Sequence, residues 1–200
     1  MKQILKVSVI IFFITGLYLV AFTFIEPAPR EIEREPGILV NKTPEQEMLE
    51  ETRTKNIDDW EITKRARFEI TGRVLSINEF DDEISEISPY DFALGWGPMS
   101  DTKNLENFKV YHSDRVAYWR TRRIPLPEKE VQKHFSNTHL VTNESHFVEK
   151  MGEVRVGNIV KLKGYLVDVQ RWRGWTWETS LRRDDNDCEI MWVEELRIID

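Results

Sequence analysis

The sequence predicts a mainly β protein, folded as a small curved sheet or barrel with one or two short helices and preceded by one transmembrane helix. Two observations predict the curved sheet: residues 68–77 alternate between apolar and polar side chains, and residues 160–169 repeat that alternation. A third observation, the charge-free run at residues 7–25, predicts the membrane helix. The 200 residues suffice for this helix, a linker and one folded domain.

The run at residues 7–25 is rich in isoleucine, leucine, valine and phenylalanine. A helix of this length spans a hydrocarbon core of about 30 Å. A cleaved signal peptide has a shorter apolar region, of about 7–15 residues, followed by small residues at the cleavage site. Here Phe22, Phe24 and Ile25 stand where small residues would be needed. We therefore expect an uncleaved signal-anchor that holds the chain in the lipid bilayer.

The charges on either side of the run predict its orientation. Lys2 and Lys6 precede it, whereas mainly acidic residues follow it. Positively charged flanks stay on the cytoplasmic side. Residues 1–6 are therefore expected in the cytoplasm, and the chain beyond residue 25 on the other side of the membrane.

Residues 26–59 are expected to form a spacer. They are rich in proline and charge and have few large apolar residues, so they bury too little surface to offset the cost of ordering. One exception is predicted near residues 44–55. Thr43 and Pro44 are typical of a helix start, and Gln46 completes a capping box, which indicates a short helix there.

The folded domain is expected over residues 60–200. The alternation in its first strand slips by one residue just past Gly72, as it does where a β-bulge inserts an extra residue. Strands bent at a glycine or a bulge curl small sheets. The pattern therefore favours a curved sheet or barrel of the OB-like or SH3-like kind.

Three further segments have the composition of strands: residues 108–120, 174–182 and 188–199. A turn at residues 171–174 is expected to join the strand at 160–169 to the next one as a hairpin. A short helix is predicted at residues 144–151, with Asn143 as its N-cap.

Charge and cysteine content exclude some classes of function. The net charge of −7 argues against a nucleic-acid-binding protein, which depends on phosphate contacts. Cys188 is the single cysteine, so no intrachain disulfide forms, and we expect a buried structural thiol. No spacing of histidine, cysteine and carboxylate residues predicts a metal site, and no motif predicts a cofactor.

The loop at residues 89–101 is the first candidate site. Gly95 and Gly97 flank Trp96 and allow close approach of the backbone to a ligand or to the core. One interpretation is a loop held by a buried tryptophan. The other is a site in which Asp91, Ser100 and Asp101 surround an aromatic ring.

Residues 134–140 form the second candidate site, because histidine, serine and asparagine suit general-base, nucleophile or polar binding roles. The catalytic candidates for a hydrolase are Asp91, Asp101, Ser136 and His139. The binding candidates are Trp96, Asn137, His139 and Trp175. Arginines interleaved with tryptophans, as around Trp175, indicate either a binding face for an anionic component or exposed strand faces with cation–π pairs.

Two motifs carry a family resemblance. Residues 91–101 (Asp-x-Ala-Leu-Gly-Trp-Gly-Pro-Met-Ser-Asp) and residues 136–140 (Ser-Asn-x-His-Leu) resemble those of an uncharacterised family of bacterial single-pass membrane-anchored proteins. The resemblance covers about residues 68–196, although Val141 and Thr142 stand where isoleucine and proline are expected. The family has no known activity. It implies a bacterial inner (cytoplasmic) membrane protein with its C-terminal domain in the periplasm.

The sequence thus predicts a membrane-anchored binding or assembly module without enzymatic activity, whose partner is another envelope protein or an anionic envelope component. The alternative is an envelope hydrolase that uses Asp91, Asp101, Ser136 and His139. An open pocket in which His139 reaches a serine or a carboxylate would favour the hydrolase. Burial of His139 against Trp96 would favour the binding module.

Overall fold

The computed structural model describes residues 31–172, 174–182 and 188–199. They belong to one compact unit that begins at Glu31. The predicted cytoplasmic residues 1–6, the predicted membrane helix at 7–25 and the first five residues of the predicted spacer lie outside the described residues. Within the described ranges, no helix is long and apolar enough to cross a membrane.

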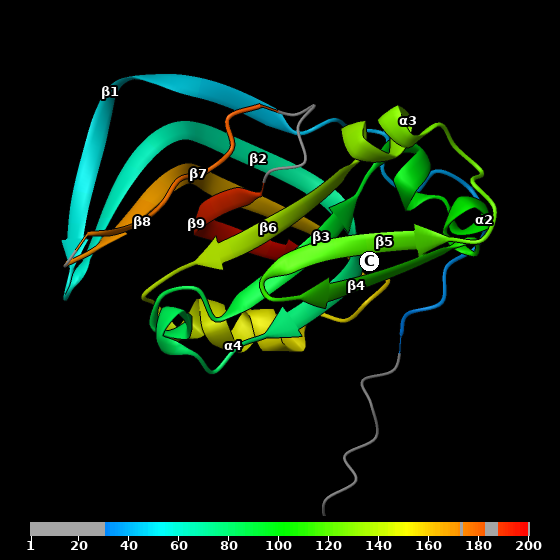
Figure 1. Ribbon diagram of the computed structural model, residues 1–200. Helices are drawn as coiled ribbons and strands as arrows, with labels where there is room; N and C mark the ends of the chain where they lie inside the picture. Colours follow the sequence, from blue (N-terminus) through cyan, green and yellow to red (C-terminus); the bar gives the residue numbers. More distant parts are fainter. Residues whose placement is uncertain (1–30, 173, 183–187, 200) are drawn as a thin grey trace, which may run out of the picture. The chain divides into compact units, whose positions relative to one another are not determined.

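Seven strands form one sheet in the order β1-β2-β3-β6-β9-β7-β8 (Figure 1). Their bounds are β1 Glu45–Ile57, β2 Trp60–Glu79, β3 Tyr90–Gly95, β6 Phe135–Val141, β7 Ile159–Arg171, β8 Trp175–Trp177 and β9 Glu189–Ile198. Every pair is antiparallel except β6–β9, which is parallel. The prediction of a mainly β fold is therefore confirmed.

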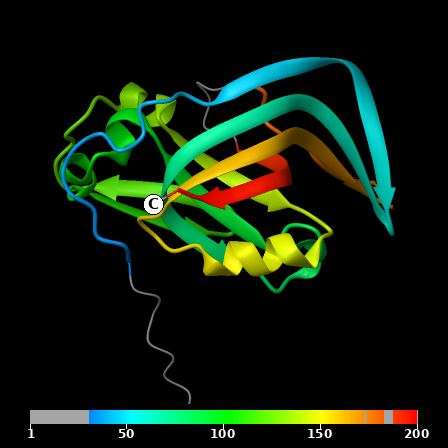
Figure 2. The same ribbon diagram turned by 180° about the vertical axis from the view of Figure 1, so that it is seen from behind.

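The sheet curls because β2 pairs on both of its edges. Its first half pairs with β7, from Trp60↔Arg171 to Arg73↔Ile159, and its second half pairs with β3. Figure 2 shows β2, β7 and β9 side by side in this curl. Only Arg73 has a partner in both β3 and β7, so the sheet curls without closing into a barrel. Of the two predicted alternatives, the curved sheet is the one that forms.

The glycines of the two repeated patterns lie where backbones approach closely. Beyond Gly72 the register of β2 against β3 shifts between Val74 and Ser76, which confirms the predicted bulge. In β7, a Cβ added to Gly164 would lie 1.9 Å from the carbonyl oxygen of Trp192 in β9. Only glycine allows this approach, which sits beside a second register shift.

Smaller elements complete the unit. A separate hairpin consists of β4 (Phe108–Ser113) and β5 (Val116–Thr121), so the strand predicted at 108–120 is in fact two strands. The helical elements are η1 Glu83–Glu86, η2 Gly97–Ser100, α2 Thr102–Leu105, α3 Glu128–Lys133 and α4 Ser145–Glu153. The predicted helix at 144–151 is confirmed as α4, and the predicted hairpin at 171–174 is confirmed as β7–β8. The N-cap of α4 is Glu144, not Asn143, and its side chain makes no capping hydrogen bond. The Glu144 N–H donates to the Thr142 hydroxyl in the preceding turn.

The helix predicted near residues 44–55 is wrong, since these residues form β1. Pairing with β2, from Glu45↔Glu69 to Ile57↔Trp60, satisfies the backbone groups that a helix would have used internally. The local cap signals at Thr43 and Pro44 are outweighed by this long pairing. β1 has the composition of a spacer because it is an edge strand whose side chains are mainly exposed and charged. Charged side chains on an edge strand protect it from pairing with further strands.

The core has two parts. The larger one lies between the curled strands and α4, and includes Phe68, Ile70, Phe92, Leu140 and Leu162. The smaller one lies under the far halves of β2 and β7, and is formed by Trp60, Ile62, Ile87, Val141, Val167, Val169, Ile190 and Trp192. Together they fix β3 and β6, which carry most of the predicted site residues.

Candidate functional site

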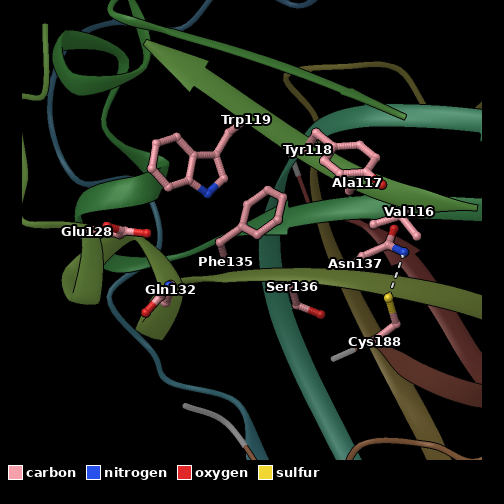
Figure 3. A pocket seen from close by; sticks show the side chains of 10 residues that line it. All are labelled: Val116, Ala117, Tyr118, Trp119, Glu128, Gln132, Phe135, Ser136, Asn137 and Cys188. Carbon is pink, nitrogen blue, oxygen red and sulfur yellow. Dashed lines mark hydrogen bonds between the residues drawn. The ribbon is translucent and has the colours of Figure 1, made fainter. Parts of the chain in front are cut away.

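A pocket of about 290 Å³ lies between β5, α3 and the start of β6 (Figure 3). Its walls are aromatic and polar, and its lining residues are Val116, Ala117, Tyr118, Trp119, Glu128, Gln132, Phe135, Ser136, Asn137 and Cys188. Two of the predicted site residues, Ser136 and Asn137, are therefore in one place. Figure 3 shows the Trp119 and Phe135 rings on the hairpin side and Glu128 and Gln132 coming from α3.

Asn137 ties three elements together beneath this pocket. Its Nδ2 donates to the carbonyl oxygen of Arg115 in the β4–β5 turn, at 2.9 Å, and to Cys188 Sγ before β9, at 3.2 Å. Its Oδ1 lies 3.1 Å from His112 Nε2 of β4. The residue is 5% exposed, so its amide is held in one orientation.

His112 links the same hairpin to β2. Because Asn137 Oδ1 can only accept, His112 Nε2 carries the proton, and Nδ1 accepts from the Ser76 hydroxyl at 2.9 Å. Burial lowers the pKa of His112, and the charge of Asp91 opposes that change only in part. The arrangement fits a neutral imidazole that positions the hairpin.

His139 and Asp91 face each other as a cross-strand pair of β6 and β3. His139 Nδ1 lies 2.8 Å from Asp91 Oδ1, and both side chains are buried. The contact is at ion-pair distance, but its angles are not those of a hydrogen bond, and the described residues give neither atom another aligned partner. The His139 ring packs on Trp177, with centroids 4.3 Å apart, and not on Trp96.

The positive charge of Arg115 lies near the negative charge of the buried Asp91 carboxylate. It sits in the β4–β5 turn with a φ of +62°, and its Nη1 lies 3.8 Å from Asp91 Oδ1. Its Nη2 and Nε also contact Asp82, at 2.6 and 3.0 Å, and these hydrogen bonds lower the pKa of Asp82. The guanidinium lies 3.8 Å above the Phe80 ring. These contacts fasten the turn of the hairpin to the main sheet.

Ser136 and His139 are not brought together. Side chains alternate along a strand, so residues three apart point to opposite faces. The Ser136 hydroxyl bonds to Glu189 Oε2, at 2.5 Å, and to the Thr138 hydroxyl on its own face. Asn137 and His139 share the other face, with 3.5 Å between Asn137 Nδ2 and His139 Nε2.

Asp101 and Trp96 belong to a different part of the domain. Asp101 Oδ1 accepts from the N–H groups of Gly37 and Lys103, and so caps α2 while it holds the N-terminal segment. Trp96 is 5% exposed and lies near the His134 ring. The loop at 95–101 thus has the structural role that was one of its two interpretations.

The same loop holds residues 37–40 through what we call the N-terminal clamp, formed by Gly97, Ser100 and Asp101. The Gly97 N–H donates to the Val40 carbonyl oxygen at 2.7 Å. The Ser100 hydroxyl accepts from the N–H groups of Leu39 and Val40, at 3.1 and 3.0 Å. Part of the predicted spacer is therefore docked on the domain.

Trp175 lies at a second, separate hollow of about 560 Å³ near the β7–β8 turn. Its ring meets Trp60 edge to face, with centroids 5.9 Å apart, and neighbouring Trp172 is 83% exposed. Arg171 lies over Trp60 and bonds to Glu83 at 2.8 Å. Arg171 therefore makes a cation–π pair with Trp60, a tryptophan outside the interleaved segments, and within those segments Arg115 lies 5.9 Å from the centroid of the Trp177 ring.

No protein-family model, curated protein or solved structure matches this chain. Within the described ranges, no three histidine, cysteine, aspartate or glutamate residues are placed to hold a metal ion. The sequence could not single out His112, Arg115, Cys188 and Glu189 as parts of the site, because each reaches it from a segment distant along the chain.

Proposed function

We propose that this protein is a non-enzymatic, membrane-anchored binding module that takes its ligand into the pocket between β5, α3 and β6. The observation that carries the proposal is the fixed Asn137 amide at the floor of an aromatic-walled pocket. Ligand sites typically combine apolar walls with a few rigidly placed polar groups. Asn137 and its neighbours supply that combination.

The separation of the hydrolase candidates supports binding over catalysis. Nucleophilic catalysis requires a serine within hydrogen-bond reach of its base. Ser136 bonds to Glu189 on the face of β6 that does not carry His139, and Asp101 holds Gly37 in the N-terminal clamp. His139 does reach a carboxylate, that of Asp91, but both are buried outside the pocket lining.

The membrane anchor is part of the proposal. It is supported by the charge-free run at 7–25, the basic residues before it and the resemblance to bacterial single-pass proteins. The partner would then be another envelope protein, met in the periplasm beside the inner membrane. A reporter enzyme that is active only outside the cytoplasm, fused after Asp200, is expected to be active, and an inactive fusion would refute this location.

We also propose an OB-like strand order for the curled sheet. It is supported by the succession β2-β3-β6-β9-β7, by the parallel pair β6–β9 and by the position of α4 between β6 and β7. OB folds are partly open five-stranded sheets that bind extended ligands. Here the β4–β5 hairpin and α3, both inserted between β3 and β6, supply two walls of the pocket.

Site-specific photo-crosslinking in cells tests the binding function. A benzophenone amino acid at Glu128, on the pocket wall, is expected to form an adduct that the same probe at exposed Met48 does not form. Gln132→Trp, which fills the pocket, should abolish the adduct. Its matched control is Lys133→Trp, on the same helix but outside the pocket lining, which should leave the adduct intact. Equal labelling from Glu128 and Met48 would refute the binding function.

A further inference from the structure

We propose that the ligand of this pocket is an extended polypeptide segment, which binds as an added strand between β5 and β6. The inference rests on the binding function proposed above and names its ligand class. Two strands line the pocket with consecutive residues. Val116 to Trp119 are four consecutive residues of β5, and Phe135 to Asn137 are three consecutive residues of β6.

Consecutive lining residues indicate strand edges. Neighbouring side chains of a strand point to opposite faces, so a pocket on one face is lined by every second residue. A pocket along an edge is lined by every residue. The pocket therefore lies along one edge of β5 and one edge of β6, as a slot between them (Figure 3).

The turn of the hairpin determines which main-chain groups of β5 face the slot. Asp114 and Arg115 form a two-residue turn, with φ of +48° and +62°, between the paired residues Ser113 and Val116. In such a hairpin the pair that flanks the turn exchanges two main-chain hydrogen bonds, and the next pair exchanges none. The two kinds of pair then alternate along the hairpin. The N–H and C=O groups of Ala117 and Trp119 therefore point away from β4, towards the slot.

The same alternation applies to β6. The Trp96 N–H donates to the His134 carbonyl oxygen at 3.1 Å, which fixes the phase of the β3–β6 ladder. The main-chain groups of Phe135 and Asn137 consequently point away from β3. On that side β9 pairs with β6 only from Thr138↔Glu189 onward, so its ladder reaches at most the Asn137 carbonyl. In the described part of the chain, nothing pairs with the Phe135 N–H and C=O or with the Asn137 N–H.

Two edges with unpaired donors and acceptors thus face one slot, which is the arrangement that strand addition uses. The volume of about 290 Å³ equals that of roughly ten water molecules and admits a short stretch of peptide. Three residues of a strand span about 10 Å. Trp119 and Phe135 offer apolar contact, and among the lining residues that the structure describes Glu128 is the one that carries a charge. We expect an apolar side chain between the rings and a basic one beside Glu128.

A proline in the slot edge tests the inference. The full chain in detergent micelles is used to select binders from a phage-displayed library of random linear dodecapeptides. Ala117→Pro removes an N–H that faces the slot, and it leaves the bonds to β4 intact because Ala117 does not use them. The affinity for the selected peptide is expected to fall about tenfold or more. Ala117→Val, which keeps the N–H, is the matched control and should bind within about threefold of the wild type.

N-methylation of the selected peptide gives a second measurement that does not depend on how Ala117→Pro folds. Methylating single amides in the bound stretch should each cost about tenfold in affinity, whereas methylation outside it should have no effect. A peptide that tolerates every methylation, or that binds Ala117→Pro as it binds the wild type, would overturn strand addition.

Failure of this inference can be told apart from failure of the binding function. If no linear peptide is enriched, but the Glu128 photo-adduct forms and is lost in Gln132→Trp, the ligand is not an extended peptide and the binding function stands. If neither peptide nor adduct is found, both are wrong. A polypeptide adduct that Ala117→Pro abolishes supports both.

Discussion

Removal of the Ser100 hydroxyl is the sharpest perturbation of the N-terminal clamp. The hydroxyl accepts from the N–H groups of Leu39 and Val40, at 3.1 and 3.0 Å, and donates to the Gly97 carbonyl oxygen at 2.7 Å. Ser100 is fully buried, so Ser100→Ala leaves these groups without a partner from that side chain. At about 1 kcal/mol for each net hydrogen bond, we expect a loss of about 3 kcal/mol in the free energy of unfolding.

For a chain of this size the loss corresponds to a fall in Tm of roughly 6–12 °C. Thermal unfolding followed by tryptophan near-UV circular dichroism measures it, and amide exchange should accelerate at residues 37–40. Ser113→Ala is the control, because that hydroxyl contacts the neighbouring Asp114 at the surface and should change the Tm by less than about 2 °C. Equal Tm values for the two variants would refute the clamp.

Three further predictions concern packing, pH and the pocket floor. Gly164→Ala should lower the free energy of unfolding by about 3 kcal/mol, because its Cβ would lie 1.9 Å from the Trp192 carbonyl oxygen. Gly152→Ala is the control, since its Cβ would meet only the Tyr90 hydroxyl, at 3.3 Å, and it should cost less. Equal losses in the two variants would contradict the contact at Gly164. Three lysines hold the pKa of Glu69 at about 2, below its usual 4.5, so its stabilisation is present above pH 4.5 and lost as the pH falls towards 2. After solvent screening, the carboxylate of Glu69 is expected to contribute about 1 kcal/mol to the free energy of unfolding above pH 4.5. Acid unfolding of Glu69→Gln should lack this loss, and a variant that unfolds in acid as the wild type does would exclude the contribution. Asn137→Leu should lower stability by about 2 kcal/mol and speed amide exchange in the β4–β5 hairpin, and unchanged exchange there would show that the amide does not fasten it.

Features set by local patterns could be predicted from the sequence. The bulge past Gly72, the β7–β8 hairpin and α4 all follow from periodicity and turn chemistry within about ten residues. β1 could not be predicted, because its charged residues alternate weakly and its strand conformation depends on pairing with β2. Secondary structure that a distant partner imposes has no local signal.

The candidate site was predictable only in part. The separation of Ser136 from His139 follows from strand parity once residues 135–141 are known to be a strand. The pairing of Asp91 with His139 requires the register of β3 against β6, which connects segments nearly fifty residues apart. Arg115 reaches Asp91 only because the hairpin turn places it there, with a positive φ that nothing in the local composition indicates.

The N-terminal clamp has a mechanical consequence. A pulling force applied to the chain before Glu31 meets the bonds at Gly37, Leu39 and Val40 before it reaches β1, which begins at Glu45. These bonds bear the force before it reaches the exposed edge strand β1. Without them, the force would break the pairs between β1 and β2 one at a time. Tension on residues 31–36 is therefore borne by the N-terminal clamp, and the pairing of β1 with β2 is spared.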